Sequence, residues 1–197
     1  MKIVIIDYGA GNIQSIKFAL KRLGYEGILS GDPEVIKSAD KVIFPGVGEA
    51  SSAMRKLKST GLEKVIPNLK QPVLGICLGM QLMCNSSEEG DTEGLGIFDV
   101  AVVHFERKLK VPHIGWNRIT DLKTDLFEGI QEKEYVYLVH SFYAPVCHET
   151  IAKCDYGVEY SSALKKNNFY GVQFHPEKSS NAGERILENF LKLETGN

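Results

Sequence analysis

Short apolar runs, each followed by a turn or an amphipathic stretch, set the pattern of the chain. The run between Lys2 and Asp7 is continuously apolar, which is typical of a strand buried on both faces of a parallel sheet. Further short strands are predicted at residues 27–30, 41–44 and 73–76. These four segments predict the strands of one sheet.

Amphipathic stretches separate these strands. Between residues 13 and 23, apolar side chains recur every three or four positions and lysines take another face, which predicts a helix. Asp32 and Pro33 suit the cap and the first position of a second, short helix. A third helix carries Met54 and Leu57. Because strand and helix alternate, the pattern predicts a parallel α/β sheet, in which chemistry sits at the carboxyl ends of the strands.

The second half of the chain is less regular. Strands are predicted at residues 97–105 and 135–139, and a closing amphipathic helix at residues 184–193. We interpret residues 112–117 as a turn that carries the only tryptophan, and the acidic segment 88–94 as a solvated surface loop. No internal repeat, low-complexity tract or linker interrupts the pattern.

Composition narrows the classes of function. With 197 residues, of which 43% are hydrophobic and 24% charged, the chain is ordinary for a soluble protein and suffices for one sizeable core. A net charge of −2 does not favour nucleic acid or a membrane as a partner. The first apolar run is too short for an export signal, and Asp7 interrupts it. We therefore expect a single domain over residues 1–197, located in the cytoplasm.

The cysteines argue against a metal site. Cys77, Cys84, Cys147 and Cys154 contain no C-x-x-C pair, the histidines contain no H-x-x-x-H pair, and a reducing compartment disfavours disulfides. The glycine-rich turn at residues 8–12 lacks the third glycine of a dinucleotide fingerprint. The sequence thus predicts neither a metal ion nor a cofactor.

Cys77 ends the apolar run at residues 73–76 and precedes a predicted helix. Gly75 and Gly79 flank it in the G-x-C-x-G form of a nucleophile elbow, where a larger residue would collide with the turn. The elbow places the thiol at a helix N-terminus, which favours a thiolate, and aims the amide of Leu78 at the same space as an oxyanion donor. The alternative is a buried strand cysteine followed by a loop with two incidental glycines.

A second apolar run, at residues 169–174, ends in a His-Pro-Glu sequence. A nucleophilic cysteine needs a base, and the base needs a group that orients it. His175 and Glu177 supply both at the end of one strand. Cys77, His175 and the glycine loop at residues 46–48 all follow predicted strands, so all three can share one edge of the sheet.

Five motifs together carry a resemblance to a known family. They lie at residues 7–12, 45–48, 75–81, 112–117 and 174–179. With them the sequence resembles the class I (triad) glutamine amidotransferases over nearly its whole length. Within that family, Met80, Lys178-Ser179 and the tryptophan motif are similar to the glutaminase subunits of imidazole glycerol phosphate synthases. One departure is the Glu-Ala-Ser-Ser sequence at residues 49–52, where many relatives carry a phenylalanine; it affects local packing rather than chemistry.

The resemblance implies a fold and a reaction. The fold is a three-layer, flavodoxin-like α/β sandwich with a mostly parallel central sheet, plus a smaller antiparallel sheet region. In the reaction, Cys77 attacks the side-chain amide of glutamine, His175 moves the protons and Glu177 holds the imidazole. Ammonia leaves, a glutamyl thioester remains, and water releases glutamate.

The resemblance also implies oxyanion donors, substrate contacts and partner contacts. The oxyanion donors are the backbone groups of Leu78, Val47 and Gly48. The substrate contacts are Gly46, Gln81 and Ser141, and the partner contacts are Asn12, Trp116 and Asn117. From the residues alone, three alternatives stay open: a surface position for Gln81, a surface position for Glu177 and a core position for Trp116.

Ammonia is mostly protonated in water at neutral pH, so a glutaminase that feeds synthesis should dock on the enzyme that uses it. The resemblance implies a heterodimer with a cyclase subunit built as a (β/α)8 barrel, which makes imidazole glycerol phosphate and aminoimidazole carboxamide ribotide in histidine biosynthesis. Two other functions remain: another Cys-His-Glu hydrolase, such as a γ-glutamyl hydrolase or an intracellular peptidase, and a binding module that has lost its activity.

Overall fold

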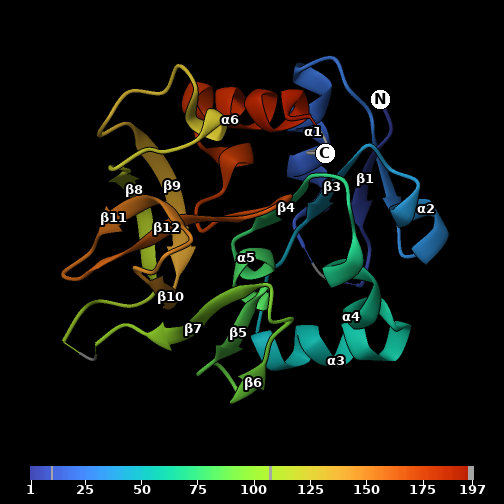
Figure 1. The fold of residues 1–197 in the computed structure, drawn as a ribbon. Helices are drawn as coiled ribbons and strands as arrows, with labels where there is room; N and C mark the ends of the chain where they lie inside the picture. Colours follow the sequence, from blue (N-terminus) through green and yellow to red (C-terminus); the bar gives the residue numbers. More distant parts are fainter. Residues whose placement is uncertain (10, 107, 195–197) are drawn as a thin grey trace.

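A computed structural model describes residues 1–9, 11–106 and 108–194, so Ala10 of the predicted glycine-rich turn lies outside the described residues. In this part of the chain, 11 strands form one mixed sheet in the order β2-β1-β3-β4-β13-β12-β10-β7-β5-β6, with β11 beside β12. The first five strands of that order all pair in parallel (Figure 1). They are β2 (Gly27–Ser30), β1 (Ile3–Ile6), β3 (Lys41–Phe44), β4 (Val73–Ile76) and β13 (Phe169–Val172).

The rest of the sheet is mostly antiparallel and extends it on the β13 side. It consists of β12 (Glu159–Lys166), β11 (Thr150–Asp155), β10 (Phe142–Pro145), β7 (Phe98–His104), β5 (Cys84–Ser87) and β6 (Thr92–Glu93). A separate two-stranded antiparallel sheet contains β8 (His113–Arg118) and β9 (Tyr135–His140). Short 3-10 turns occupy Ile66–Asn68, Asp125–Phe127 and Pro176–Lys178.

Helices cover both faces of the parallel strands (Figure 1). They are α1 (Ile13–Arg22), α2 (Pro33–Lys37), α3 (Ala50–Thr60), α4 (Leu62–Val65), α5 (Leu78–Leu82) and α6 (Ser180–Lys192). Successive strand residues point to opposite faces, so Ile3 and Ile5 pack in one core cluster with α1 and α6. Val4 and Ile6 pack in a second cluster with α2 and α3. Burial on both faces explains the continuously apolar strands, and the expected three-layer α/β fold is confirmed.

The prediction of a turn at residues 112–117 was wrong, because most of that segment is strand β8. Ile114 and Trp116 pair with Val139 and Tyr137 of β9, yet both side chains are exposed, whereas His113 is buried. The strand therefore places apolar residues outside and a polar residue inside, the reverse of the alternation by which a strand is usually recognised. The pattern of apolar and polar residues therefore does not predict this strand.

The closing helix begins at Ser180, four residues before the predicted start. Gly183 lies in its first turn, where a Cβ would stand 1.9 Å from the Pro176 carbonyl oxygen. The glycine is thus required by close packing within a helix, and it does not mark a turn.

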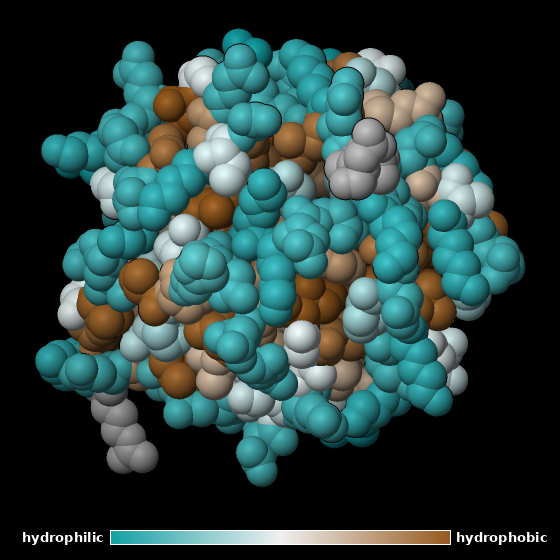
Figure 2. All heavy atoms as spheres, viewed as in Figure 1, coloured by the Kyte–Doolittle hydropathy of each residue, from teal (hydrophilic) through white to brown (hydrophobic). Residues whose placement is uncertain are grey.

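The outer surface is dominated by polar side chains, with apolar ones between them on the face shown in Figure 2. Within the described residues, every helix is too short or too polar to cross a lipid bilayer.

Candidate active site

Cys77 sits at the junction of β4 and α5 in a conformation that few non-glycine residues adopt. Its φ is 53° and its ψ is −111°, and its amide donates to the Val172 carbonyl of β13 at 2.8 Å. A Cβ at Gly79 would lie 2.0 Å from the Phe44 carbonyl oxygen, and one at Gly75 would lie 2.4 Å from Met83 Cε. The surrounding backbone therefore holds the strained turn in place, as an elbow requires.

His175 and Glu177 lie on the neighbouring segment, just beyond β13. His175 Nδ1 is 2.8 Å from Glu177 Oε1, and both side chains are almost completely buried. Burial alone would lower the pKa of His175, but interactions with Cys77 and Glu177 outweigh it and raise that pKa to about 10. At neutral pH the imidazole is therefore protonated, with the Glu177 carboxylate on one side and the sulfur on the other.

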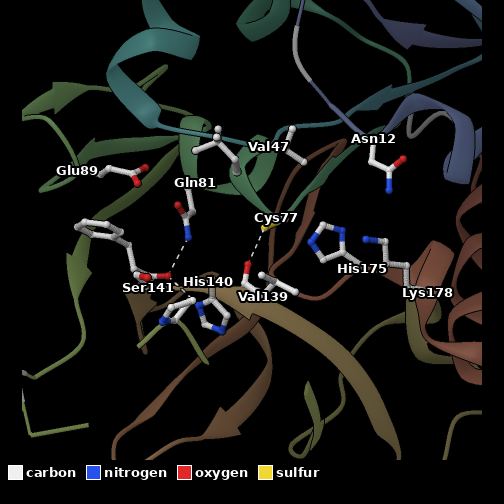
Figure 3. A pocket seen from close by; sticks show the side chains of 14 residues that line it. Asn12, Val47, Cys77, Gln81, Glu89, Val139, His140, Ser141, His175 and Lys178 are labelled. Atoms are coloured by element: carbon white, nitrogen blue, oxygen red, sulfur yellow. Dashed lines mark hydrogen bonds between the residues drawn. The ribbon is translucent and has the colours of Figure 1, made fainter. Parts of the chain in front are cut away.

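A pocket of about 350 Å³ opens in front of the sulfur (Figure 3). Its lining brings together residues from seven segments of the chain: Asn12, Val47, Gly48, Cys77, Leu78, Gln81, Glu89, Pro112, Val139, His140, Ser141, Phe142, His175 and Lys178. The Cys77 thiol donates to the Val139 carbonyl of β9 at 3.7 Å. The pocket is of a size that holds an amino acid, and it places a thiol and an imidazole at one end.

A chain of amide groups forms one wall behind the sulfur. Gln81 Nε2 donates to the Phe142 carbonyl at 2.8 Å and to Gln173 Oε1 at 2.9 Å. Gln173 Nε2 in turn lies 3.7 Å from Cys77 Sγ. His140 Nδ1 is 2.8 Å from the same Phe142 carbonyl oxygen.

The glycine loop at residues 46–48 packs on the elbow from the other side. A Cβ at Gly46 would come within 2.6 Å of the Gly79 nitrogen, so the loop lies directly on the start of α5. The Tyr8 hydroxyl donates to the Pro45 carbonyl at 2.9 Å and fixes the chain just before the loop. Burial and the nearby Cys77 raise the pKa of Tyr8 far above its usual range, so it stays a neutral donor.

Within the part of the chain that the structure describes, no three His, Cys, Asp or Glu side chains are grouped so that they could hold a metal ion. The pocket offers a thiol, an imidazole, amide groups, the Glu89 carboxylate and the Lys178 ammonium group.

Known proteins are similar to this chain in sequence and in fold. The sequence profile described as "Glutamine amidotransferase class-I" matches residues 4–193. The chain belongs to the class-I glutamine amidotransferases.

Two relatives place this amidotransferase within the family. A protein of Bacteroides thetaiotaomicron named imidazole glycerol phosphate synthase subunit HisH is 58% identical over 196 residues, which cover 98% of this chain and 100% of the relative. The subunit of the same name from Vibrio vulnificus strain CMCP6 is 47% identical over 200 residues, covering 98% of each. The chain is thus a member of the HisH branch of the class-I amidotransferases.

Solved structures agree on the fold at low sequence identity. A crystal structure described as a glutamine amidotransferase superposes with a TM-score of 0.74 at 18% identity, covering 96% of this chain and 97% of that one. A structure described as PurLQS from Thermotoga maritima gives a TM-score of 0.72 at 16% identity, again covering 96% and 97%.

The structure brings most of the predicted site residues of this amidotransferase to one pocket, but not all of them. Gly46 and Glu177 stand behind the lining, and Trp116 and Asn117 lie away from it on β8. Asn12 lies at the rim beside Lys178 in Figure 3. The Asn117 side chain donates to the Asp155 carbonyl at 2.8 Å, which ties it to its own chain.

Sequence reasoning missed Glu89, because the whole acidic segment was interpreted as solvated. Its carboxylate accepts from the Ala50 amide at 2.9 Å, at the start of α3, and it lines the pocket. Burial raises the pKa of Glu89. The sequence of an acidic segment does not indicate which carboxylate faces inward, so the structure is needed to identify Glu89.

Sequence reasoning also missed Gln173, which stands behind the pocket, and His140, which is part of its lining. Gln173 does carry a signal: it is the one polar residue within an otherwise apolar strand end, between Val172 and Phe174. A polar side chain at such a position must find partners inside the protein.

Proposed function

We propose that this chain releases ammonia from glutamine through a thioester on Cys77 and delivers it to a cyclase subunit. One observation carries the proposal: a strained elbow presents Cys77 beside the buried His175–Glu177 pair, at the end of a pocket of amino-acid size. A nucleophile, a base and a group that orients the base are the parts that covalent amide hydrolysis needs.

The first half of the reaction makes the thioester. His175 already holds a proton at neutral pH, and the Cys77 sulfur attacks the side-chain amide carbon of glutamine as the thiolate. The carbonyl oxygen becomes an oxyanion, which the backbone amides of Leu78 and of Val47 or Gly48 stabilise, at about 3 kcal/mol for one such donor. His175 then gives its proton to the leaving nitrogen, the C–N bond breaks and ammonia departs.

The second half restores the enzyme. His175 takes a proton from water, and the resulting hydroxide attacks the thioester carbon through a second oxyanion. The C–S bond then breaks, the sulfur keeps the electron pair as a thiolate beside the protonated His175, and the product leaves as glutamate once its new carboxyl group has lost its proton to solvent. Throughout both halves, Glu177 accepts the Nδ1–H of His175 and stabilises the imidazolium that forms.

Gln81 and Glu89 suit the α-ammonium group of glutamine. Both hydrogens of Gln81 Nε2 are taken by Phe142 and Gln173, and among the described residues none donates to Gln81 Oε1. That oxygen and the Glu89 carboxylate lie on the same side of the pocket in Figure 3. Two acceptors facing one space match a donor-only cation. Ser141 lines the pocket on the β9–β10 side, where it can contact the substrate.

The partner that we propose is a (β/α)8-barrel cyclase, in a heterodimer that makes imidazole glycerol phosphate and aminoimidazole carboxamide ribotide. The names of the relatives, which describe parts of a synthase, support an assembly of this kind. On this chain, Ile114, Trp116 and Tyr135 are exposed on the β8–β9 sheet, and β9 also carries the Val139 carbonyl beside the sulfur. A partner seated there would meet ammonia as it leaves, with Asn12 at the rim. We assign Asn117 to the flank of this contact.

We further propose that residues 1–197 act as one domain, because both core clusters share the central sheet. We place the protein in the cytoplasm, because its four cysteines are all free, as a reducing compartment would keep them.

Labelling with an electrophilic glutamine analogue, followed by peptide mapping, tests the proposed function. Only a thiol in a glutamine pocket should react at low analogue concentration, and glutamine should protect it. We expect the label on Cys77. A label mainly on Cys84, Cys147 or Cys154, or labelling that glutamine does not slow, would contradict the proposal.

A further inference from the structure

Gln173 is a fully buried amide that the reaction above does not use. It follows β13, two residues before His175, and its exposed fraction is 0%. Its backbone amide donates to the Ser162 carbonyl at 2.9 Å, which fixes the main chain at this point. Burying an amide without hydrogen-bond partners is costly, so the hydrogen bonds of this side chain indicate what it does in the protein.

The orientation of the Gln173 amide follows from a backbone oxygen that can only accept. The Phe142 carbonyl has no hydrogen to give, so the group of Gln81 that faces it at 2.8 Å must be the NH₂. The second hydrogen of that NH₂ points to Gln173 at 2.9 Å, so the atom of Gln173 there must be its oxygen. The NH₂ of Gln173 is then left facing Cys77 Sγ at 3.7 Å.

His140 agrees with this assignment from the other side. Its Nδ1 also faces the Phe142 carbonyl oxygen and must therefore carry a hydrogen, while its Nε2 accepts from the Tyr160 hydroxyl at 3.2 Å. Burial lowers the pKa of His140 to about 3, so the ring is neutral at pH 7. His140 and Gln81 thus both donate to the Phe142 carbonyl, and from Gln81 the donors run through Gln173 to the sulfur.

We propose that Gln173 is a positioning residue that donates a hydrogen bond to the Cys77 sulfur and holds Gln81 with its carbonyl oxygen toward the pocket. A donor favours the thiolate over the thiol, because a hydrogen bond to a charged acceptor is stronger than one to a neutral acceptor. The same amide ties the nucleophile to the group that we assign to the substrate ammonium. The inference rests on the proposed function, since it takes Cys77 as the nucleophile and Gln81 as a substrate contact.

Other titratable groups also surround the pocket that holds the sulfur, and the test has to separate Gln173 from them. These groups lie on several elements around the pocket. They are His175, Glu177 and Lys178 beyond β13, Tyr8 after β1, Tyr160 on β12, His140 on β9 and Glu89 in the acidic segment. All of them are kept when only the Gln173 side chain is changed, so any effect on the thiol belongs to the amide.

The experiment measures the rate at which iodoacetamide alkylates Cys77 against pH, in the full chain, by quantifying the Cys77 peptide. Gln173→Met removes both amide groups while keeping the volume of the side chain, and Gln173→Leu serves if the methionine variant does not fold. We expect the midpoint of the rate profile to move up by about one pH unit, because the thiolate loses a donor. In the complex with the cyclase, the KM for glutamine should rise about tenfold as Gln81 loses its orientation, and kcat should fall as well.

Gln71→Met is the matched control. Gln71 is another buried glutamine whose Nε2 donates to a backbone carbonyl, that of Ile36 at 2.8 Å, but it lies at the opposite ends of the strands from the pocket. It should lose stability like the Gln173 variants and keep the alkylation profile and KM of the wild type.

An unchanged alkylation profile in a folded Gln173 variant would overturn this inference alone, provided that Cys77 is the labelled residue in the wild type. A profile that moves as far in Gln71→Met as in Gln173→Met would also overturn it, because the effect would then be one of stability. Labelling of another cysteine in the wild type would overturn the proposed function and this inference together.

Discussion

His175 shows how the surroundings of a single side chain decide its charge. It is buried, which by itself would favour the neutral ring, yet its pKa lies near 10 because Cys77 and Glu177 both favour the cation. The Glu177 oxygen that does not face the ring is buried and has no hydrogen-bond partner among the described residues. The Glu177 carboxylate is thus placed to stabilise the protonated form of His175.

A raised pKa makes stability depend on pH. The folded state keeps a proton on His175 that the unfolded chain, with a pKa of about 6.5, has lost, so this contribution is complete below pH 6.5 and disappears as pH rises through about 10. We expect the free energy of unfolding in urea to fall between pH 7 and pH 10, by at most about 1.4 kcal/mol per pH unit from this group. His175→Gln, which keeps an N–H for Glu177, should flatten the decline. An equal decline in both proteins would contradict the assigned pKa shift.

Elements, rather than single residues, carry the strain at the elbow. Cys77 has a positive φ at the tight turn between β4 and α5, and the start of α5 packs closely against the backbone at Phe44. Gly79 is the tightest point, since a Cβ there would lie 2.0 Å from the Phe44 carbonyl oxygen.

Gly79→Ala should therefore destabilise the fold by about 3 kcal/mol or more, measured by urea unfolding, because backbone has to move. Gly24→Ala is the comparison: Gly24 has a φ of +83° and open space around it, so it reports the cost of the conformation alone, about 1–2 kcal/mol. If Gly79→Ala were no worse than Gly24→Ala, the close approach seen at the elbow would be wrong.

The same elements show how far sequence reasoning reaches. The parallel strands, the helices between them and the elbow were predicted from the sequence, because burial on two faces and a required glycine both leave strong patterns. Strand β8 was not, since its apolar residues Ile114 and Trp116 face outward. Glu89 and Gln173 were not either, because their roles depend on contacts between segments far apart in sequence.

The loop at residues 46–48 is the element that we expect to control activity. Gly48 has a φ of +92°, and Val47 stands exposed at 44% on the edge of the pocket. Glycine makes a peptide flip cheap, so the loop can present an N–H to the oxyanion in one state and a carbonyl in another. An active state populated at about 0.1–10% would keep the lone chain nearly idle.

Steady-state glutaminase kinetics test this control. We expect low activity in the lone chain and a rise in the complex with the liganded cyclase, in kcat much more than through a lower KM, because a donor used in the transition state is being supplied. Full activity without the partner, or a gain confined to KM, would rule out the loop as the controlling element.

At the scale of the whole molecule, the pocket opens where two layers of different character meet. The parallel strands supply Cys77 and His175, and the separate β8–β9 sheet supplies the Val139 carbonyl beside the sulfur. The outer side of that small sheet carries Trp116, which is 51% exposed and packs edge-on against Tyr137 at 5.8 Å. The sheet thus reaches from the nucleophile to the surface that we assign to the cyclase.

Trp116→Ala should weaken binding of the cyclase at least tenfold, because large aromatic side chains dominate protein interfaces. Phe18→Ala is the matched control, an aromatic residue on α1 with an exposed fraction of 60%. Titration calorimetry against the cyclase compares the two. Equal losses, or none for Trp116→Ala, would move the interface away from β8.

We expect this chain to supply ammonia through Cys77 and to take no other part in the synthesis. The most direct measurement is product formation by the complex that carries Cys77→Ala, with glutamine or with an ammonium salt as the nitrogen source. We predict no product from glutamine and a rate from ammonium salt equal to that of the wild-type complex. Glutamine-dependent synthesis by the variant would contradict the role of Cys77 as the nucleophile that releases ammonia.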